Sequence, residues 1–328
     1  QVIAESLGMT LPHAALTPSG TNLWIDTGRR SAIALKNLID KNIKTKDILT
    51  SRAFENAMIV HAACGGSTNL ILHLPAVAHA IKEKIMKVED WIRINKLTPR
   101  LVDVLPNGPK GFPTSVFFSA GGVPEVMLKL RDEGLLNLDV TTSTGLTLNE
   151  NLDWWEQSEK REFVRKQLKN TRNIDPEDVV NSFQNSKKKN MTSTVTFPKG
   201  NIAPEGSVVK STAIDKTVID DDGVYRKIGP ARIFISEADA IKAVKDKGAN
   251  GVKAGDIMVV VCGGPKGTGM QEVAQITIAL KYLNHGKEVA LITDGRFSGV
   301  STGACIGHIG PEALDGGHIG KLKENDLI

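Results

Sequence analysis

Cysteine is scarce in this sequence. Its 328 residues contain three cysteines, Cys64, Cys262 and Cys305, which stand far apart with no CxxC spacing. An odd, scattered set of this kind argues against both a disulfide framework and a zinc site, and it fits a reducing compartment. We therefore expect a cytoplasmic protein whose thiols are mostly small buried side chains.

The sequence also lacks long apolar runs and a strong charge bias. No run approaches the ~20 apolar residues that a membrane-spanning helix needs. The net charge is only +4, and the basic residues are dispersed except in Glu159–Arg172 and Lys187–Lys189. Dispersed charge of this kind is typical of a solvated surface, so neither a membrane nor a nucleic acid is expected as a partner.

An ordinary globular composition remains once these classes are excluded. Apolar residues make up 41% and charged residues 24% of the chain, which is long enough for two domains. Gln1 leads directly into an expected helix over Val2–Leu7, without a basic segment before it. We therefore expect no signal peptide, and a chain that begins within a domain.

A buried strand, a Gly-Gly junction and a helix recur along the chain. Strands are predicted over Ala57–Ala63, Ser115–Ala120 and Asp256–Cys262, with helices following at about 68–84, 123–133 and 270–283. A further strand is predicted over Glu288–Thr293. Alternating strands and helices indicate α/β architecture with parallel pairing and a right-handed crossover between the last two strands. Because parallel strands end at one edge of a sheet, the loops after Cys262 and Thr293 should face one cleft.

A polar region separates two parts of the chain. It contains a charged helix predicted over Asp153–Lys169 and a lysine-rich stretch, with the boundary placed near Lys187–Thr194. A strand-rich unit should begin at Gly200–Ala213. The domains are accordingly assigned to residues 1–190 and 191–328.

The first candidate site is the run Cys64-Gly65-Gly66-Ser67-Thr68-Asn69. Glycines allow close approach of the backbone to a ligand, and a helix N-terminus offers free N–H groups to an anion. A close-packed turn in which Ser67 or Thr68 caps the following helix explains the pattern equally well.

The second candidate is Glu272, in the glycine-rich run that follows Cys262. Lys266 is not placed as in a Walker A loop, which excludes that phosphate site. Glu272 is expected in the first turn of a helix, where the helix dipole favours a carboxylate. The alternative is that it is a ligand for a hard cation such as Mg²⁺.

The third candidate is Ser298, in the run Asp294-Gly295-Arg296-Phe297-Ser298-Gly299. A serine among small residues at a strand end can be exposed to substrate, although it needs a base or a cation to react. A tight turn satisfied by the hydroxyl is the alternative. The absence of a Gly-x-Ser-x-Gly elbow argues against an α/β-hydrolase, and none of the seven histidines has metal-ligand spacing.

Several runs resemble the dihydroxy-acid/6-phosphogluconate dehydratase family. They are GGSTNLILHL at 65–74, GNIAPEGSVVK at 200–210, GPKGTGMQE at 264–272 and ALITDGRFSGVSTGACIGHIGPEA at 290–313. The runs VCGGPKGTGM, DGVYRKIGPARIF and STGACIGHIGPEAL are most similar to the sugar-acid branch that includes xylonate dehydratases. The resemblance covers essentially the whole chain.

This resemblance implies a hydro-lyase that dehydrates a sugar acid to a 2-keto-3-deoxy acid, with Mg²⁺ and an iron–sulfur cluster. It implies that Ser298 is the base and Glu272 a Mg²⁺ ligand, with Ser67, Thr68, Asn69, Arg296 and Thr302 on the substrate side. It further implies a layered α/β/α portion followed by a swivelling, β-barrel-like α/β domain, both incomplete, in a homodimer or homotetramer. Dihydroxy-acid dehydratase and 6-phosphogluconate dehydratase are the alternative activities.

This sequence departs from the family pattern at the metal centres. The family's cluster cysteines and its Asp-Lys pair belong to a part expected before Gln1, and none of the cysteines present takes their place. We therefore expect no cluster ligand in this chain and no activity from the chain alone. A binding module for anions, built on the Gly-Gly junctions, is the non-enzymatic alternative.

Overall fold

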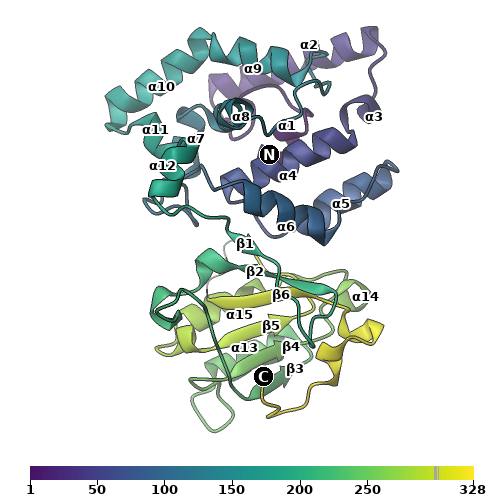
Figure 1. Cartoon of the computed structure of the whole chain (residues 1–328), viewed down its shortest axis with the longest axis vertical. Coiled ribbons are helices and arrows are strands. Elements are labelled where there is room, and N and C mark those ends of the chain that lie inside the picture. The colour runs from purple at the N-terminus through teal and green to yellow at the C-terminus, as the bar shows by residue number, and fades with distance from the viewer. Residues whose placement is uncertain (299–300, 302) are drawn as a thin grey trace. The chain divides into compact units, whose positions relative to one another are not determined.

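The computed structural model describes residues 1–298, 301 and 303–328. The chain forms two compact units. The first comprises residues 1–66 and 73–193, and the second comprises residues 67–72 and 194–328. Figure 1 shows the helices of the first unit and the sheet of the second. None of the described helices combines the length and the apolarity needed to cross a bilayer.

The first unit is built from helices, and over its described residues the only β-structure consists of isolated bridges such as Val102↔Val180. Helix α4 (Ser51–Cys64) lies at its centre, packs against α1, α6 and α8, and buries ten of its 14 residues. The helices are α1 (Val2–Ser6), α2 (Asn22–Asp40), α3 (Thr45–Ile48), α4, α5 (Leu70–Ala80, of which the part from His73 belongs to this unit), α6 (Val88–Leu97), α7 (Thr114–Ser119), α8 (Gly122–Asp132), α9 (Leu148–Glu156), α10 (Glu159–Arg172), α11 (Pro176–Val179) and α12 (Phe183–Lys188).

The strands predicted over Ala57–Ala63 and Ser115–Ala120 are wrong, because both segments are helical, in α4 and α7. A short apolar run does not distinguish a buried strand from a buried helix, and the alanines of the first run favour helix. The Thr50 side chain caps α4, and Gly65 ends it in the left-handed conformation at φ 62°.

The charged helix predicted over Asp153–Lys169 is two helices, α9 and α10. The chain breaks at Gln157 and Ser158, and the Ser158 hydroxyl accepts the N–H of Arg161 at 3.2 Å. This serine is an N-cap inside a pattern that otherwise favours a continuous helix.

The second unit contains a six-stranded mixed sheet in the order β1-β2-β6-β5-β4-β3. Strands β3 to β6 are parallel, whereas β2 runs antiparallel to β1 and β6. The elements are β1 (Val195–Thr196), β2 (Gly206–Lys210), β3 (Ala231–Phe234), α13 (Glu237–Lys245), β4 (Ile257–Val260), α14 (Pro265–Thr268), α15 (Ala274–Lys281), β5 (Ala290–Thr293) and β6 (Ala304–Gly310). The structure confirms the α/β class. It also confirms the two strands predicted in this region, which are β4 and β5 and pair in parallel.

Strand β4, which lies between β5 and the edge strand β3, is buried on both faces, as expected for a parallel strand covered on two sides. Met258 and Val260 belong to the core on the α13 and α15 side, while Ile257 and Val259 belong to the core on the opposite side. This rigid strand fixes the start of the loop at Val261.

The outer edge of the sheet, β3, is covered by the segment 323–328. The N–H of Ala231 donates to the Asp326 carbonyl at 2.8 Å, and the N–H of Asn325 donates to the Ala231 carbonyl at 2.9 Å. The Glu324 carboxylate accepts the N–H of Ile233 at 2.8 Å. The segment therefore pairs with β3 partly through its backbone and partly through a side chain.

Candidate active site

The loops that follow β4 and β5 lie side by side, as the parallel pairing of these strands predicts. One carboxylate, that of Asp294, joins them: its Oδ1 accepts the N–H of Gly263 at 2.9 Å and its Oδ2 accepts that of Cys262 at 3.1 Å. Asp294 is 1% exposed, so a buried carboxyl group holds the two loops together.

Glu272 and Arg296 form a parallel bridge between these loops. The Val273 N–H donates to the Arg296 carbonyl at 2.9 Å, and the Arg296 N–H donates to the Gln271 carbonyl at 3.1 Å. The Arg296 guanidinium also donates through Nε to the carbonyl of Met270 at 2.7 Å. The candidates Glu272 and Arg296 therefore lie in the loops that follow β4 and β5, and Glu272 is half-buried.

The predicted position of Glu272 in the first turn of a helix is wrong, because α15 begins at Ala274. The residues before it are held in turns: Gly269 and Met270 have φ values of 70° and 73°. Glu272 is consequently extended and bridged to Arg296, so the helix dipole does not explain it.

The segment 67–72 belongs to the same unit and carries two further candidates. The Thr68 hydroxyl donates to the carbonyl of Phe297 at 3.2 Å, and Thr68 is 1% exposed. The Asn69 amide donates through Nδ2 to Oε1 of Glu272 at 3.0 Å. Ser67 is exposed, and its hydroxyl accepts the N–H of Asn69 at 3.3 Å.

Ser298 is half-buried and directly follows Phe297, the residue that Thr68 contacts. Its carbonyl accepts the N–H of Ser301 at 2.9 Å. The candidate Thr302 lies outside the described residues, as do Gly299 and Val300. The structure thus brings Asn69 to Glu272, and Thr68 to the residue before Ser298.

His308 in β6 also lies beside this loop, a position that the sequence did not indicate. Its N–H donates to the Gly295 carbonyl at 2.8 Å, and its ring stands edge-on to Phe297 with 6.1 Å between centroids. Burial, with a smaller effect of the Arg296 charge, lowers the pKa of His308 to about 4. The ring is therefore neutral at pH 7. The backbone of His308 has a φ of 53°, and no pattern in the sequence predicts this conformation.

The cysteines do not form a cluster site. Burial raises the pKa of Cys64 to about 12 and also raises the pKa of Cys305 and Cys262. Iron–sulfur ligands are thiolates, which these environments disfavour. Over the described residues no three His, Cys, Asp or Glu side chains are grouped so as to hold a metal ion.

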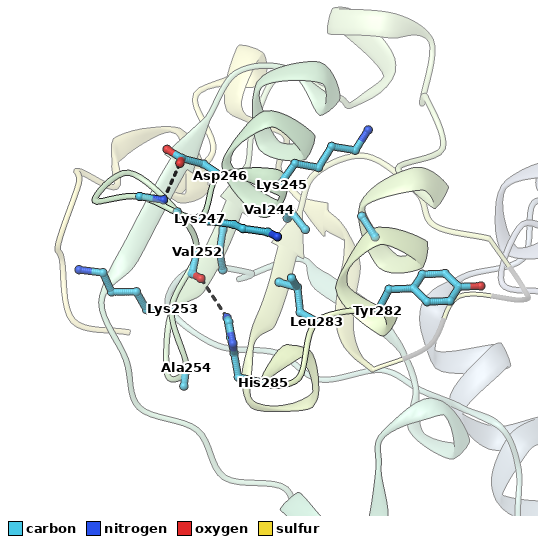
Figure 2. A pocket seen from close by; sticks show the side chains of 13 residues that line it. Val244, Lys245, Asp246, Lys247, Val252, Lys253, Ala254, Tyr282, Leu283 and His285 are labelled. Carbon is cyan, nitrogen blue, oxygen red and sulfur yellow. Dashed lines mark hydrogen bonds between the residues drawn. The ribbon is translucent and has the colours of Figure 1, made fainter.

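A cavity of about 670 Å³ lies near the start of β4, at the end of this strand opposite to Cys262 (Figure 2). It is formed where α13 and α15 end and where the chain returns to β4, with lining residues that include Val244, Lys247, Val252, Leu283 and His285. Helix C-termini carry partial negative charge, so the lysines here compensate the helix ends. The cavity thus lies away from the strand ends that carry Glu272 and Ser298.

Comparison with known proteins gives a consistent result for both parts of the chain. The dihydroxy-acid/6-phosphogluconate dehydratase N-terminal model matches residues 1–151, and the corresponding C-terminal model matches residues 178–328.

Individual relatives extend this result. The chain is 58% identical to the D-xylonate dehydratase YagF and 59% identical to the D-xylonate dehydratase YjhG, both of Escherichia coli K12, over its full length and 50% of theirs. It is 40% identical to the dihydroxy-acid dehydratase of Leifsonia xyli over 99% of its length and 52% of that protein. The chain therefore spans about half the length of the curated relatives that it matches.

Proposed function

Because the chain belongs to the dihydroxy-acid/6-phosphogluconate dehydratase family, we propose that it carries active-site residues of a sugar-acid dehydratase. The substrate proposed is an aldonate such as D-xylonate, and the product is a 2-keto-3-deoxy acid. The higher identity to the two D-xylonate dehydratases, 58–59% against 40% for a dihydroxy-acid dehydratase, favours this substrate over a branched-chain dihydroxy acid.

The observation that supports this function most directly is the meeting of Asn69 and Glu272 beside the loop that carries Ser298. In the proposed reaction Ser298 removes the proton from C2 of the acid. A serine hydroxyl is a very weak acid, so its alkoxide forms only where positive charge stabilises it.

Oxygen donors of the kind that Mg²⁺ prefers are present at this place. Glu272 offers a half-buried carboxylate, which the amide of Asn69 contacts through Nδ2. We propose that Glu272 holds Mg²⁺. When bound, this ion supplies the positive charge that lowers the pKa of the Ser298 hydroxyl and of the carbon acid at C2.

The iron–sulfur cluster of the proposed enzyme does not fit the cysteines of this chain, for the reasons of pKa and grouping given above. No step involving the cluster is therefore assigned to these residues. We expect the purified chain to show no iron–sulfur absorption band after reconstitution with iron and sulfide.

We also propose that the protein is a cytoplasmic homo-oligomer. Helix α2 supports self-association, because Trp24, Leu35 and Ile39 on one stripe of this helix are 55%, 59% and 68% exposed. The three free thiols support a reducing compartment.

A chimaera provides the test of the activity. This chain replaces the matching half of YagF, and the product is assayed with D-xylonate, a hexonate, 6-phosphogluconate and a branched dihydroxy acid. We expect D-xylonate to be dehydrated fastest. A folded chimaera that dehydrates only the branched dihydroxy acid would overturn the proposed substrate, and one that dehydrates none of the four would overturn the proposed function.

A further inference from the structure

We infer that Asn69 is a positioning residue for Glu272: it holds the carboxylate in the orientation in which it receives a divalent cation. The inference rests on the proposed function for the role of Glu272, and on the structure alone for the contact. The contact joins two residues 203 positions apart, at a distance of 3.0 Å between Nδ2 and Oε1.

The segment that carries Asn69 is anchored on both sides of it. Thr68 is bound to the Phe297 carbonyl, and Ile71 packs against the core of the second unit formed by α13, α15 and the sheet. These contacts fix the backbone from which the Asn69 amide reaches Glu272. The backbone of Asn69 is therefore held in place independently of the bond between its amide and the carboxylate.

The orientation of the amide follows from chemistry. A carboxylate only accepts hydrogen bonds, so the NH₂ group of Asn69 must face Glu272 and its Oδ1 must face away. That Oδ1 atom is buried and has no hydrogen-bond partner among the described residues. An unpaired buried acceptor is unfavourable by about 1–3 kcal/mol, so stability alone would not favour asparagine here.

The contact leaves the carboxylate able to bind a cation. Asn69 engages Oε1 of Glu272 and does not occupy the second oxygen, Oε2, of the same carboxylate. A neutral amide donor orients the carboxylate without cancelling its charge, which a lysine or arginine partner would do. Partners of this kind keep ligands in place before the metal arrives.

Titration of the purified chain with Mn²⁺, followed by electron paramagnetic resonance, tests the inference without relying on turnover. We expect Asn69→Ala to weaken Mn²⁺ binding by about tenfold. Asn69→Leu, which fills the space but cannot donate, should weaken it by a similar factor. Glu272→Gln should weaken it at least as much, and Asn37→Ala, which removes an exposed asparagine of α2, should leave it unchanged.

A second measurement does not depend on metal. In a double-mutant cycle of Asn69→Ala and Glu272→Ala, hydrogen exchange of the β4 and β5 amides reports the stability of the second unit. We expect the two substitutions to be coupled by about fivefold in the opening equilibrium, as for a hydrogen bond to a partly exposed charge. Additive effects of the two substitutions would overturn the inference. If Mn²⁺ binds the chain too weakly to be titrated, the double-mutant cycle by itself tests whether Asn69 holds Glu272.

The outcomes separate the two claims. Mn²⁺ binding that Glu272→Gln weakens and both Asn69 variants leave intact would refute the positioning role while the proposed function stands. Mn²⁺ binding unaffected by Glu272→Gln would remove Glu272 from the proposed metal site, and the cycle would still decide whether Asn69 holds it.

Discussion

The Oδ1 atom of Asp294 accepts the backbone N–H of Gly263 at 2.9 Å, which joins the loop after β5 to the loop after β4. The same carboxylate accepts, through Oδ2, the N–H groups of Cys262 at 3.1 Å and Ala313 at 2.8 Å. Three chain segments therefore meet at one buried side chain, and the loops of Glu272 and Ser298 take their positions from it.

Asp294→Asn should destabilise the second unit by about 2 kcal/mol, because an NH₂ group would then face a backbone N–H and leave it unpaired. Hydrogen exchange of the β4 and β5 amides measures the change. The matched control is Asp315→Asn, which disturbs only an exposed ion pair with Lys266 and should change stability by less than about 1 kcal/mol. Equal effects of the two substitutions would contradict the role given to Asp294.

Ser298→Ala in the YagF chimaera should lower kcat by at least about 10²-fold, the lower end of what a positioned acid or base contributes. The control is Ser301→Ala, which removes a hydroxyl that pairs with that of Thr277 at 3.2 Å. That control should lose some stability and keep its activity. A Ser298→Ala chimaera with undiminished kcat would exclude this serine as the base.

Gly307→Ala should disturb the site through packing. A Cβ atom at this glycine of β6 would lie 2.5 Å from the Phe297 ring, so the ring and the adjacent Ser298 would have to shift. We expect a destabilisation of about 1–3 kcal/mol, measured by thermal unfolding, and a loss of activity in the chimaera. Gly200→Ala, where no atom lies within 4 Å of the added carbon, is the control and should be nearly neutral.

The stability of the first unit should depend on pH through two buried groups with opposite slopes. Burial lowers the pKa of His13 to about 3, so its contribution is complete above pH 6.5 and is lost as the pH falls towards 3. Burial raises the pKa of Glu5 to about 7, so its contribution is complete below pH 4.5 and is lost as the pH rises through 7.

Between pH 4.5 and 6.5 the two slopes oppose each other, and stability should be nearly flat. His13→Asn should convert this plateau into a slope, with stability rising as the pH falls from 7 to 4.5. Urea unfolding followed by tryptophan fluorescence measures this, because all four tryptophans lie in the first unit. A plateau that survives the substitution would contradict the assignment to His13.

Local sequence patterns predicted the second unit better than the first. The strands β4 and β5 are β-branched apolar runs followed by turn residues, and two such strands in sequence imply that their loops meet. The run at Ala57–Ala63 is also apolar, but its alanines pack as a helix surrounded by other helices, a context that no local pattern records.

The sequence allowed the residues of the candidate site to be proposed, but it did not give their geometry. The roles proposed for Glu272 and Ser298 come from the resemblance to a known family and stay predictions. The contacts of Thr68 with Phe297 and of Asn69 with Glu272 span 229 and 203 positions, so only the folded chain reveals them. The backbone of Met270 and His308, at positive φ, is likewise set by tertiary packing.

The cover over β3 has a consequence for the behaviour of the protein at high concentration. An open strand edge can act as a template for a strand of another molecule and so start a fibril. Both outward N–H groups of β3 are already taken, that of Ala231 by the Asp326 carbonyl and that of Ile233 by the Glu324 carboxylate. A single acidic side chain thus completes the shielding of an edge that would otherwise invite aggregation.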